Sequence, residues 1–186
     1  MRSHLFLFAA IFFSLLNLAF PAYVMAEKDP HGILAKRVGS WKATVNVKVP
    51  KAMTFEGEEK IGWALKHNYL MGKGFYDDKL DGKKTEVINL MTYNPLDKQY
   101  YIWEFKAAEQ VQPVPTVGTW DADKQEMILS ADYGKSGTGT GTWKFGEDGS
   151  FVWTYEMKDE KGNVFFSVDG KQVKMETNDS PNDKTK

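Results

Sequence analysis

A strict alternation of apolar and polar residues, beginning at Trp41, constrains the fold more than any other feature of this chain. Tryptophan, alanine and valine occupy the odd positions from Trp41 to Val49, and lysine, threonine and asparagine occupy the even positions. This alternation is typical of a β-strand that buries one face and exposes the other to water. The apolar stretch 33–38 immediately before it is predicted to form a short turn of helix.

Clusters of glycine, proline, asparagine and aspartate divide the rest of the chain into short segments. Such residues supply the backbone angles that tight turns require. The segments between them are rich in β-branched and aromatic residues, which favour strands. Nine turns, and therefore ten strands, are predicted; the turns lie at Pro50, 72–74, 81–82, 94–97, 113–115, 121–123, 133–134, 146–149 and 159–162.

The absence of helical periodicity outside about 30–38 determines how these strands connect. Without crossover helices, consecutive strands pair antiparallel with their neighbours. A ten-stranded meander avoids two exposed edges by closing on itself. We therefore expect an all-β fold, an up-and-down antiparallel barrel of about ten strands with a short N-terminal helix turn. A two-layer β-sandwich is the alternative.

The first 26 residues are predicted to be a cleaved signal peptide. Arg2 is followed by an apolar run from 5 to 20, and Val24-Met25-Ala26 resembles a cleavage site. The run is shorter than the roughly 20 residues that span a bilayer, although an uncleaved anchor is the alternative. Cleavage after Ala26 predicts a periplasmic or secreted protein without a stable membrane anchor, with one domain over 27–175. The tail 176–186 has no aliphatic or aromatic residue and is predicted to be disordered.

Composition excludes several kinds of function. The chain has no cysteine, so disulfides and thiolate chemistry are absent. Lysine and arginine nearly balance aspartate and glutamate, and Arg37 is the only arginine after the leader, so no nucleic-acid partner is expected. His31 and His67 lack the spacing of metal ligands, so no metal site is expected.

Several short motifs occur in a characteristic order. They are Gly39-Ser40-Trp41, Leu70-Met71-Gly72-Lys73-Gly74-Phe75, Met91-Thr92-Tyr93-Asn94-Pro95 and Val117-Gly118-Thr119-Trp120-Asp121. Over about 32–175 the chain resembles an uncharacterised bacterial family of secreted, lipocalin-like (calycin) proteins, a domain of unknown function. The resemblance implies a barrel and no established activity.

The resemblance to lipocalin-type barrels also carries two expectations about single residues. It implies that a cation from the last strand packs on the Trp41 indole, and Lys171 and Lys174 are the candidates. Some related barrels bind haem through a histidine near the C-terminus. No histidine follows His67, so no cofactor is expected.

The interior of a barrel is the natural place for a ligand. The predicted ligand-binding residues are the aromatic side chains expected to face the lumen and two polar anchors among them: Glu59, Trp63, Asn89, Tyr93, Tyr101, Trp103, Trp153 and Tyr155. Glu59 either projects into the lumen or reaches water at the barrel mouth. The alternating glycines at 137–141 either leave space inside the barrel or have aromatic side chains lying across them.

The leading hypothesis is an exported protein that binds a hydrophobic or aromatic small molecule in its lumen. No catalytic residue is assigned. One alternative is a barrel enzyme of the lyase or isomerase type, using Glu59 with Tyr93 or Tyr101 for acid–base chemistry. The other is a protein-interaction module with a solid core.

Overall fold

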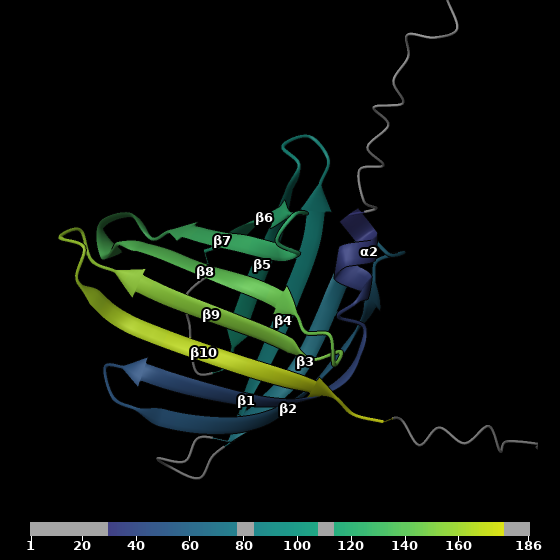
Figure 1. Ribbon diagram of the computed structural model, residues 1–186, viewed down its shortest axis with the longest axis horizontal. Coiled ribbons are helices and arrows are strands. Elements are labelled where there is room, and N and C mark those ends of the chain that lie inside the picture. Colours follow the sequence, from purple (N-terminus) through teal and green to yellow (C-terminus); the bar gives the residue numbers. More distant parts are fainter. Residues whose placement is uncertain (1–29, 78–83, 108–113, 177–186) are drawn as a thin grey trace, which may run out of the picture. The chain divides into compact units, whose positions relative to one another are not determined.

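The computed structural model describes residues 30–77, 84–107 and 114–176 (Figure 1). The chain divides into two compact units, 1–33 and 34–186. Helix α2 (Pro30–Ala35) crosses the boundary between them, and the strands all belong to the second unit. The predicted signal peptide and all but the first residue of the predicted tail lie outside the described residues. Among the described helices, none is long and apolar enough to cross a membrane.

The described residues of the second unit contain ten antiparallel strands. They are β1 (Gly39–Val49), β2 (Met53–Ala64), β3 (Tyr69–Asp77), β4 (Lys84–Asn94), β5 (Gln99–Lys106), β6 (Thr116–Asp121), β7 (Glu126–Asp132), β8 (Thr138–Phe145), β9 (Phe151–Lys158) and β10 (Val164–Lys174). A short 3-10 helix, η1 (Gly134–Ser136), precedes β8.

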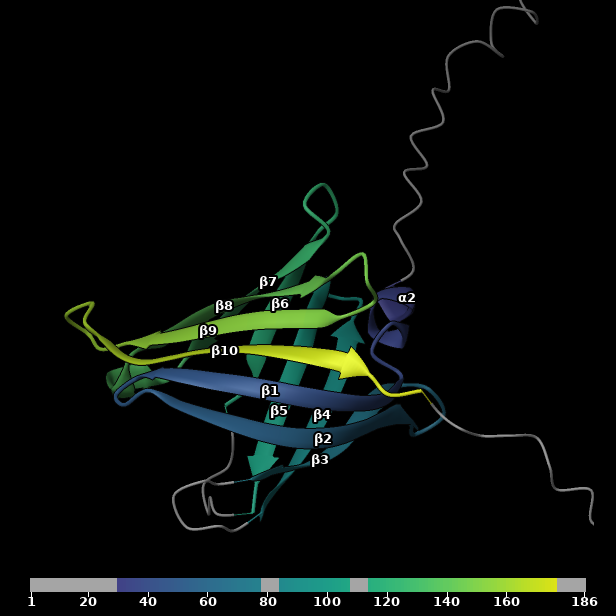
Figure 2. The ribbon, with the colours of Figure 1, turned by 60° about the horizontal axis from the view of Figure 1, so that its bottom comes forward.

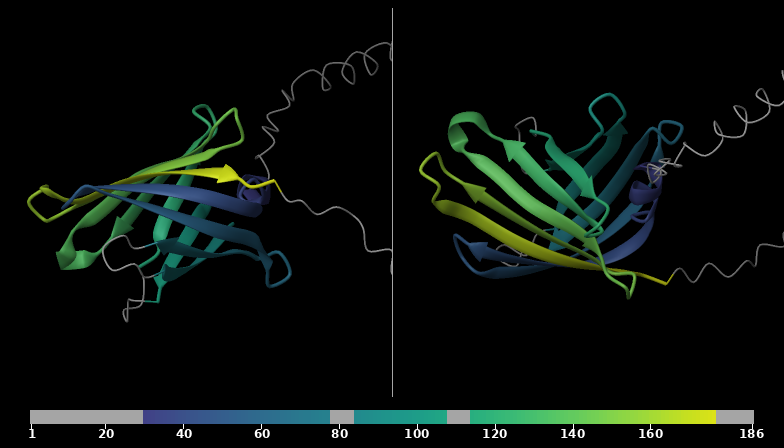
Figure 3. Two further views of the ribbon diagram at one scale, coloured as in Figure 1. Left: turned by 90° about the horizontal axis from the view of Figure 1, so that it is seen from below. Right: turned by 45° about the horizontal axis from the view of Figure 1, so that its top comes forward.

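Each strand pairs with its neighbour in sequence, and the sheet closes where β1 pairs with β10. Figure 2 shows β1 lying between β10 and β2. Both views in Figure 3 show β10 and β1 side by side, at the seam between the two ends of the meander. The predicted all-β, ten-stranded antiparallel barrel is therefore confirmed, and the sandwich alternative is excluded.

One predicted turn is wrong, although the strand count is right. Gly72 and Gly74 lie inside β3, and the chain reverses at 65–68 instead. Leu65, Lys66 and His67 all have positive φ there, of 49°, 57° and 67°. Positive φ is uncommon for residues other than glycine, so this turn lacks the usual sequence signal.

Strand register determines which side chains face the interior. Paired residues lie on the same face, and one inward row runs through Trp63, Leu70, Met91 and Ile102. Three of these four are buried. In β4 the inward residues are therefore Val87, Asn89, Met91 and Tyr93, and the two of them predicted to face the interior, Asn89 and Tyr93, do so.

Candidate functional site

Glu59 lies at the centre of a polar cluster inside the barrel. Its side chain is in β2 and the residue is only 3 % exposed. Glu59 Oε2 accepts hydrogen bonds from Gln172 Nε2 at 2.9 Å and from Arg37 Nη2 at 3.3 Å. Glu59 Oε1 accepts a hydrogen bond from Asn89 Nδ2 at 2.9 Å. The interpretation in which Glu59 reaches water at the barrel mouth is therefore wrong, because its carboxylate is enclosed by partners from three other segments.

Two glycines in the neighbouring strand make room for this carboxylate. Gly74 pairs with Glu59 across the sheet, and Gly72 follows on the same inward face. A Cβ added at Gly72 would collide with Glu59 Oε1, and one at Gly74 would lie 2.8 Å from the Glu58 carbonyl oxygen and 3.3 Å from Glu59 Cβ. The glycines in the middle of β3 are thus explained by the close approach of β2, through a side chain at Gly72 and through the backbone at Gly74, rather than by a turn.

Arg37 is the cationic partner of Glu59 and is also buried, at 4 % exposed. Its Nη1 donates to Gln172 Oε1, so Gln172 binds both charged groups. Its guanidinium carbon lies 3.8 Å from the Phe151 ring centroid and within 6 Å of the Trp41 and Trp143 rings. Burial lowers the pKa of Arg37 from its usual value, and the Glu59 charge opposes that shift.

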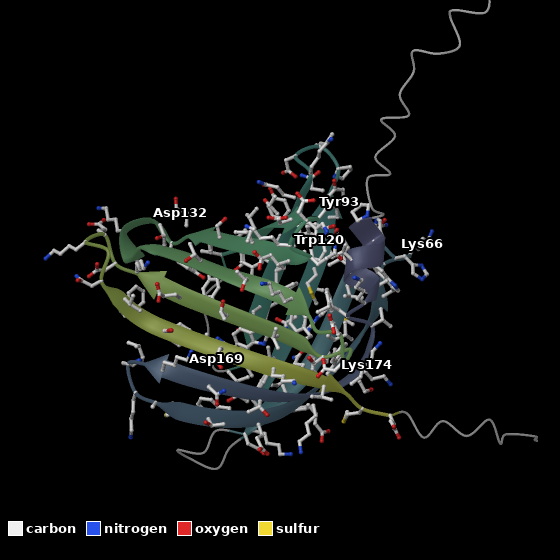
Figure 4. The ribbon with its side chains drawn as sticks, in the orientation of Figure 1. Lys66, Tyr93, Trp120, Asp132, Asp169 and Lys174 are labelled. Atoms are coloured by element: carbon white, nitrogen blue, oxygen red, sulfur yellow. The ribbon has the colours of Figure 1, made fainter. Side chains whose placement is uncertain are left out.

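Trp41 is buried beside this cluster and packs against two cations. It is 1 % exposed, and its indole Nε1 donates to the Arg37 carbonyl oxygen at 2.8 Å. Lys174 Nζ lies 5.4 Å from the ring centroid. Figure 4 shows Lys174 near the C-terminal end of β10. The expected contact between Trp41 and a lysine of the last strand is confirmed, and Arg37 adds a cation that the sequence did not indicate.

Tyr76 extends the cluster along β3. Burial raises the pKa of its phenol well above the usual range, and the charges of Glu59 and Glu104 raise it further. A hydrogen bond with the Gln172 side chain opposes the shift in pKa. Tyr76 therefore stays neutral at physiological pH and contributes a hydroxyl to the cluster.

A second polar cluster involves Tyr155 of β9. Its hydroxyl lies 3.0 Å from that of Tyr133. Both residues are part-exposed. Burial raises the pKa of Tyr155, and the hydrogen bond with Tyr133 adds to the effect. Cβ atoms added at Gly139 and Gly141 would collide with the Tyr155 ring or hydroxyl. For Gly139 and Gly141, the structure supports the interpretation in which an aromatic side chain lies across the glycines.

Six of the eight predicted ligand-binding residues face the interior. Glu59 and Asn89 are hydrogen-bonded to each other, as described above. The other four are aromatic and part-exposed: Trp63, Tyr93, Trp153 and Tyr155.

These inward aromatic residues have identifiable neighbours. Trp63 contacts the His67 ring at 5.7 Å between centroids, and Tyr93 contacts Tyr100 at 5.0 Å. Figure 4 marks Tyr93. Trp153 lies across Gly170 of β10, where an added Cβ would collide with the indole.

The other two predicted residues lie on the outside of the barrel. Tyr101 donates its hydroxyl to Asp97 Oδ2 at 2.7 Å and stacks on Trp103 at 5.9 Å. The inward residues of β5 are Tyr100 and Ile102, which are both buried. Because residues 100–103 are apolar or aromatic on both faces, alternation alone does not identify the inner one. Tyr101 and Trp103 are not brought together with the interior residues.

Arg37, Gln172 and Tyr76 are the members of the Glu59 cluster that sequence reasoning missed. The one available signal was Arg37 itself, one of two arginines in the chain and two residues before Gly39. Gln172 carried no signal, because a single glutamine in a strand has no characteristic spacing.

A surface groove lies apart from these clusters. It has a volume of about 590 Å³ and runs over the outer face of β1, β10, β9 and β8, where it is lined by outward residues such as Thr44, Thr142 and Lys171. Within the described ranges, no group of three or more histidine, aspartate or glutamate side chains has the arrangement to hold a metal ion.

Comparison with known proteins places this chain in a family. The model of the family described as "Protein of unknown function (DUF1579)" matches residues 26–177, and the chain belongs to that family. The predicted membership of a lipocalin-like family of unknown function is thus confirmed. No curated protein sequence matches the chain.

Two solved structures have a similar fold. One is the S-type phycobiliprotein lyase CPES from Guillardia theta, with a TM-score of 0.56 and 13 % identity over 78 % of this chain and 92 % of that chain. The other is Rv2717c from M. tuberculosis, with a TM-score of 0.56 and 12 % identity over 79 % of this chain and 98 % of that chain. At this level of identity, the likeness shows the barrel fold alone.

Proposed function

We propose that this protein is an exported barrel that binds an apolar or aromatic small molecule in its lumen. One observation carries the proposal. Trp63, Tyr93, Trp153 and Tyr155 all face inward in a closed barrel, yet each remains part-exposed. Each of these inward side chains therefore keeps aromatic surface that other residues do not cover, and a ligand that covered this surface would be stabilised by its burial.

In this proposal, the Glu59 cluster is a rigid polar part of the interior beside the ligand. Arg37 and Glu59 compensate each other's charge, and Gln172 bonds to both. Asn89 is part-buried and bonded to Glu59, so its amide oxygen is a polar group available to a ligand. The ligand that fits this arrangement is an uncharged or weakly polar molecule.

The enzyme alternative has less support from the same residues. The Glu59 carboxylate already accepts three hydrogen bonds, which leaves little of it free for proton transfer to a ligand. The raised pKa of Tyr76 makes its phenol a weak proton donor. The fold shared with the phycobiliprotein lyase does not add a catalytic group.

The proposal is tested with the neutral aromatic dye N-phenyl-1-naphthylamine, whose fluorescence rises in apolar surroundings. We expect saturable binding at one site per chain. Trp153→Leu should weaken the affinity about tenfold, because it removes a large share of the inward aromatic surface. Native mass spectrometry of protein purified from its own source then identifies any resident ligand by the mass lost on denaturation.

Trp103→Leu is the matched control, since it removes the same side chain from the outer face of the barrel. The dye affinity of this variant should equal that of the unmodified protein. Lack of saturable binding, or equal losses in the two variants, would refute a lumenal site. Export is tested separately by N-terminal sequencing of the protein from the periplasm or medium, which should begin at Glu27.

A further inference from the structure

The two most exposed large apolar side chains in the described part of the chain lie on neighbouring hairpins. Leu96, in the β4–β5 turn, is 93 % exposed, and Leu65, in the β2–β3 turn, is 71 % exposed. The two hairpins are adjacent because β3 pairs with β4. Thr92 Oγ1 of β4 also donates to the Asn68 carbonyl oxygen of the β2–β3 turn at 2.8 Å. We call residues 65–68 and 95–98 the leucine tips.

Both leucines are held outward by ordered local structure. Leu65 begins a run of three residues with positive φ, a conformation that is costly for side chains other than glycine. In the β4–β5 turn, Asn94 Oδ1 accepts the Leu96 backbone N–H at 3.1 Å, and Asn94 Nδ2 donates to Asp97 at 2.9 Å. These hydrogen bonds stabilise the conformation of the turn, and they therefore fix the direction in which Leu96 projects.

Charge distinguishes the leucine tips from the other turns at the same end of the strands. The tips contain Lys66, His67 and Lys98, with one carboxylate, Asp97, which is hydrogen-bonded to Asn94 and Tyr101. The other two turns at this end are acidic: Asp121, Asp123 and Lys124 after β6, and Glu147 and Asp148 after β8. An anionic surface would attract the leucine tips and repel the other two turns.

We propose that the leucine tips dock on an anionic lipid bilayer, with Leu65 and Leu96 entering the interfacial layer and Lys66 and Lys98 facing lipid headgroups. Exposed apolar side chains flanked by lysines are the features that bind peripheral proteins to such surfaces. Trp63 is inward-facing and packs on His67 of the first tip. Docking therefore brings the bilayer close to the aromatic interior, which suits the exchange of an apolar ligand.

The experiment measures co-sedimentation of the purified protein with two kinds of vesicle, one of phosphatidylcholine alone and one containing phosphatidylglycerol as well. We expect binding to the anionic vesicles that weakens with added salt. The double variant Leu65→Ser/Leu96→Ser should lose about tenfold or more of this affinity, since each leucine contributes buried apolar area. All variants share one N-terminus, so the leader region contributes equally to each.

Val173→Ser is the control, because Val173 is also exposed, at 52 %, but lies on the outer face of β10. Circular dichroism and thermal melting establish that each variant is folded. The proposal is overturned if the anionic vesicles do not bind the protein, or if the double variant binds as well as Val173→Ser. Self-association in light scattering that the double variant abolishes would instead assign the tips to a second copy of the chain. None of these measurements depends on dye binding in the lumen. A negative result for bilayer docking can therefore be distinguished from a negative result for ligand binding.

Discussion

The interior of this barrel contains two polar clusters that are built in the same way but differ in their access to water. Glu59 lies over Gly72 and Gly74 of the next strand, and Tyr155 lies over Gly139 and Gly141 of its neighbour. In both places, glycine in one strand makes room for a long polar side chain from another. Yet Glu59 and its partners Arg37 and Gln172 are buried, whereas Tyr155 and Tyr133 remain part-exposed.

The chemistry of the side chains explains this difference. A buried carboxylate is tolerated only with a cation and further hydrogen bonds, and the Glu59 cluster provides both. A phenol has an apolar ring with one polar end, so it remains at the boundary between core and water at little cost. The Glu59 cluster should thus be a rigid structural element, and the Tyr155 cluster a more tolerant one.

The largest expected effect on stability comes from removing Arg37, the cation of the rigid Glu59 cluster. Arg37→Met would leave the Glu59 carboxylate buried without its counter-charge and would also remove the stacking on Phe151. Loss of one partner of a buried ion pair typically costs about 3–5 kcal/mol in the free energy of unfolding. Urea denaturation followed by tryptophan fluorescence measures the loss.

The double variant Arg37→Met/Glu59→Gln separates the buried charge from lost packing. It should recover more than half of the stability lost in Arg37→Met, because no uncompensated charge remains in the interior. A double variant as unstable as Arg37→Met would show that packing of the arginine, rather than charge compensation, stabilises this end of the barrel.

Filling the space beside the carboxylate is expected to have the next largest effect. In Gly72→Ala the new methyl group would collide with Glu59 Oε1, whereas the Cβ of Gly62→Ala would meet no atom within 4 Å. We expect Gly72→Ala to destabilise the fold by about 1–3 kcal/mol, as other overpacked cores do. Gly62→Ala should leave stability unchanged or raise it by up to about 1 kcal/mol.

Thermal melting of the two alanine variants, with Glu59→Ala/Gly72→Ala as a third, tests this interpretation. If the collision is with Glu59, then Gly72→Ala should cost much less in the background that lacks this side chain. Equal costs in both backgrounds would mean that Gly72 is required for a different reason.

The tyrosines make the stability of the fold sensitive to alkaline pH. Burial raises the pKa of both Tyr76 and Tyr155, so the folded state holds these phenol protons more tightly than the unfolded chain. Their contribution to stability is therefore intact below a pH of about 10, where an unfolded tyrosine titrates, and is lost as the pH rises further. Tyr155→Phe should reduce the slope of stability against pH in this range, and Tyr76→Phe/Tyr155→Phe should reduce it more.

At neutral pH the same variant measures the Tyr155 cluster itself. Tyr155→Phe removes the hydrogen bond with Tyr133 and should cost about 0.5–1.5 kcal/mol in urea denaturation. That value is well below the one expected for Arg37→Met. A larger loss for Tyr155→Phe than for Arg37→Met would reverse the ranking of the two clusters.

Local patterns in the sequence were sufficient to predict the fold. The period-two alternation after Trp41 and the recurring turn residues led to ten antiparallel strands and to closure. Where only one face of a strand is apolar, as in β1, the inward side was also predictable. In β5 both faces of the Tyr100–Trp103 stretch are apolar or aromatic, so its inward side depends on pairing with β4 and β6.

The polar clusters could be predicted only in part. Glu59 and Asn89 were recognisable as polar residues on inward faces. Arg37 and Gln172 lie 22 and 113 positions from Glu59, and only barrel closure brings all three together. The sequence wrongly predicts a turn at Gly72 and Gly74, because glycine supplies both positive φ and close packing and the sequence alone does not distinguish these uses.

The smallest expected effect on stability tests whether Lys174 belongs to the rigid Glu59 cluster. Lys174 lies over the buried Trp41 ring, while Lys171 on the same strand pairs with exposed Asp148. Lys174→Met should cost about 0.5–1 kcal/mol through the lost cation–π contact, whereas Lys171→Met should change stability by less than about 0.5 kcal/mol. Thermal melting at low and high salt distinguishes the two, because the exposed pair is the more strongly screened. If Lys174→Met does not change the stability of the fold, the cation that stabilises Trp41 is Arg37 alone. Gln172, and not Lys174, is then the last residue of β10 that belongs to the rigid cluster.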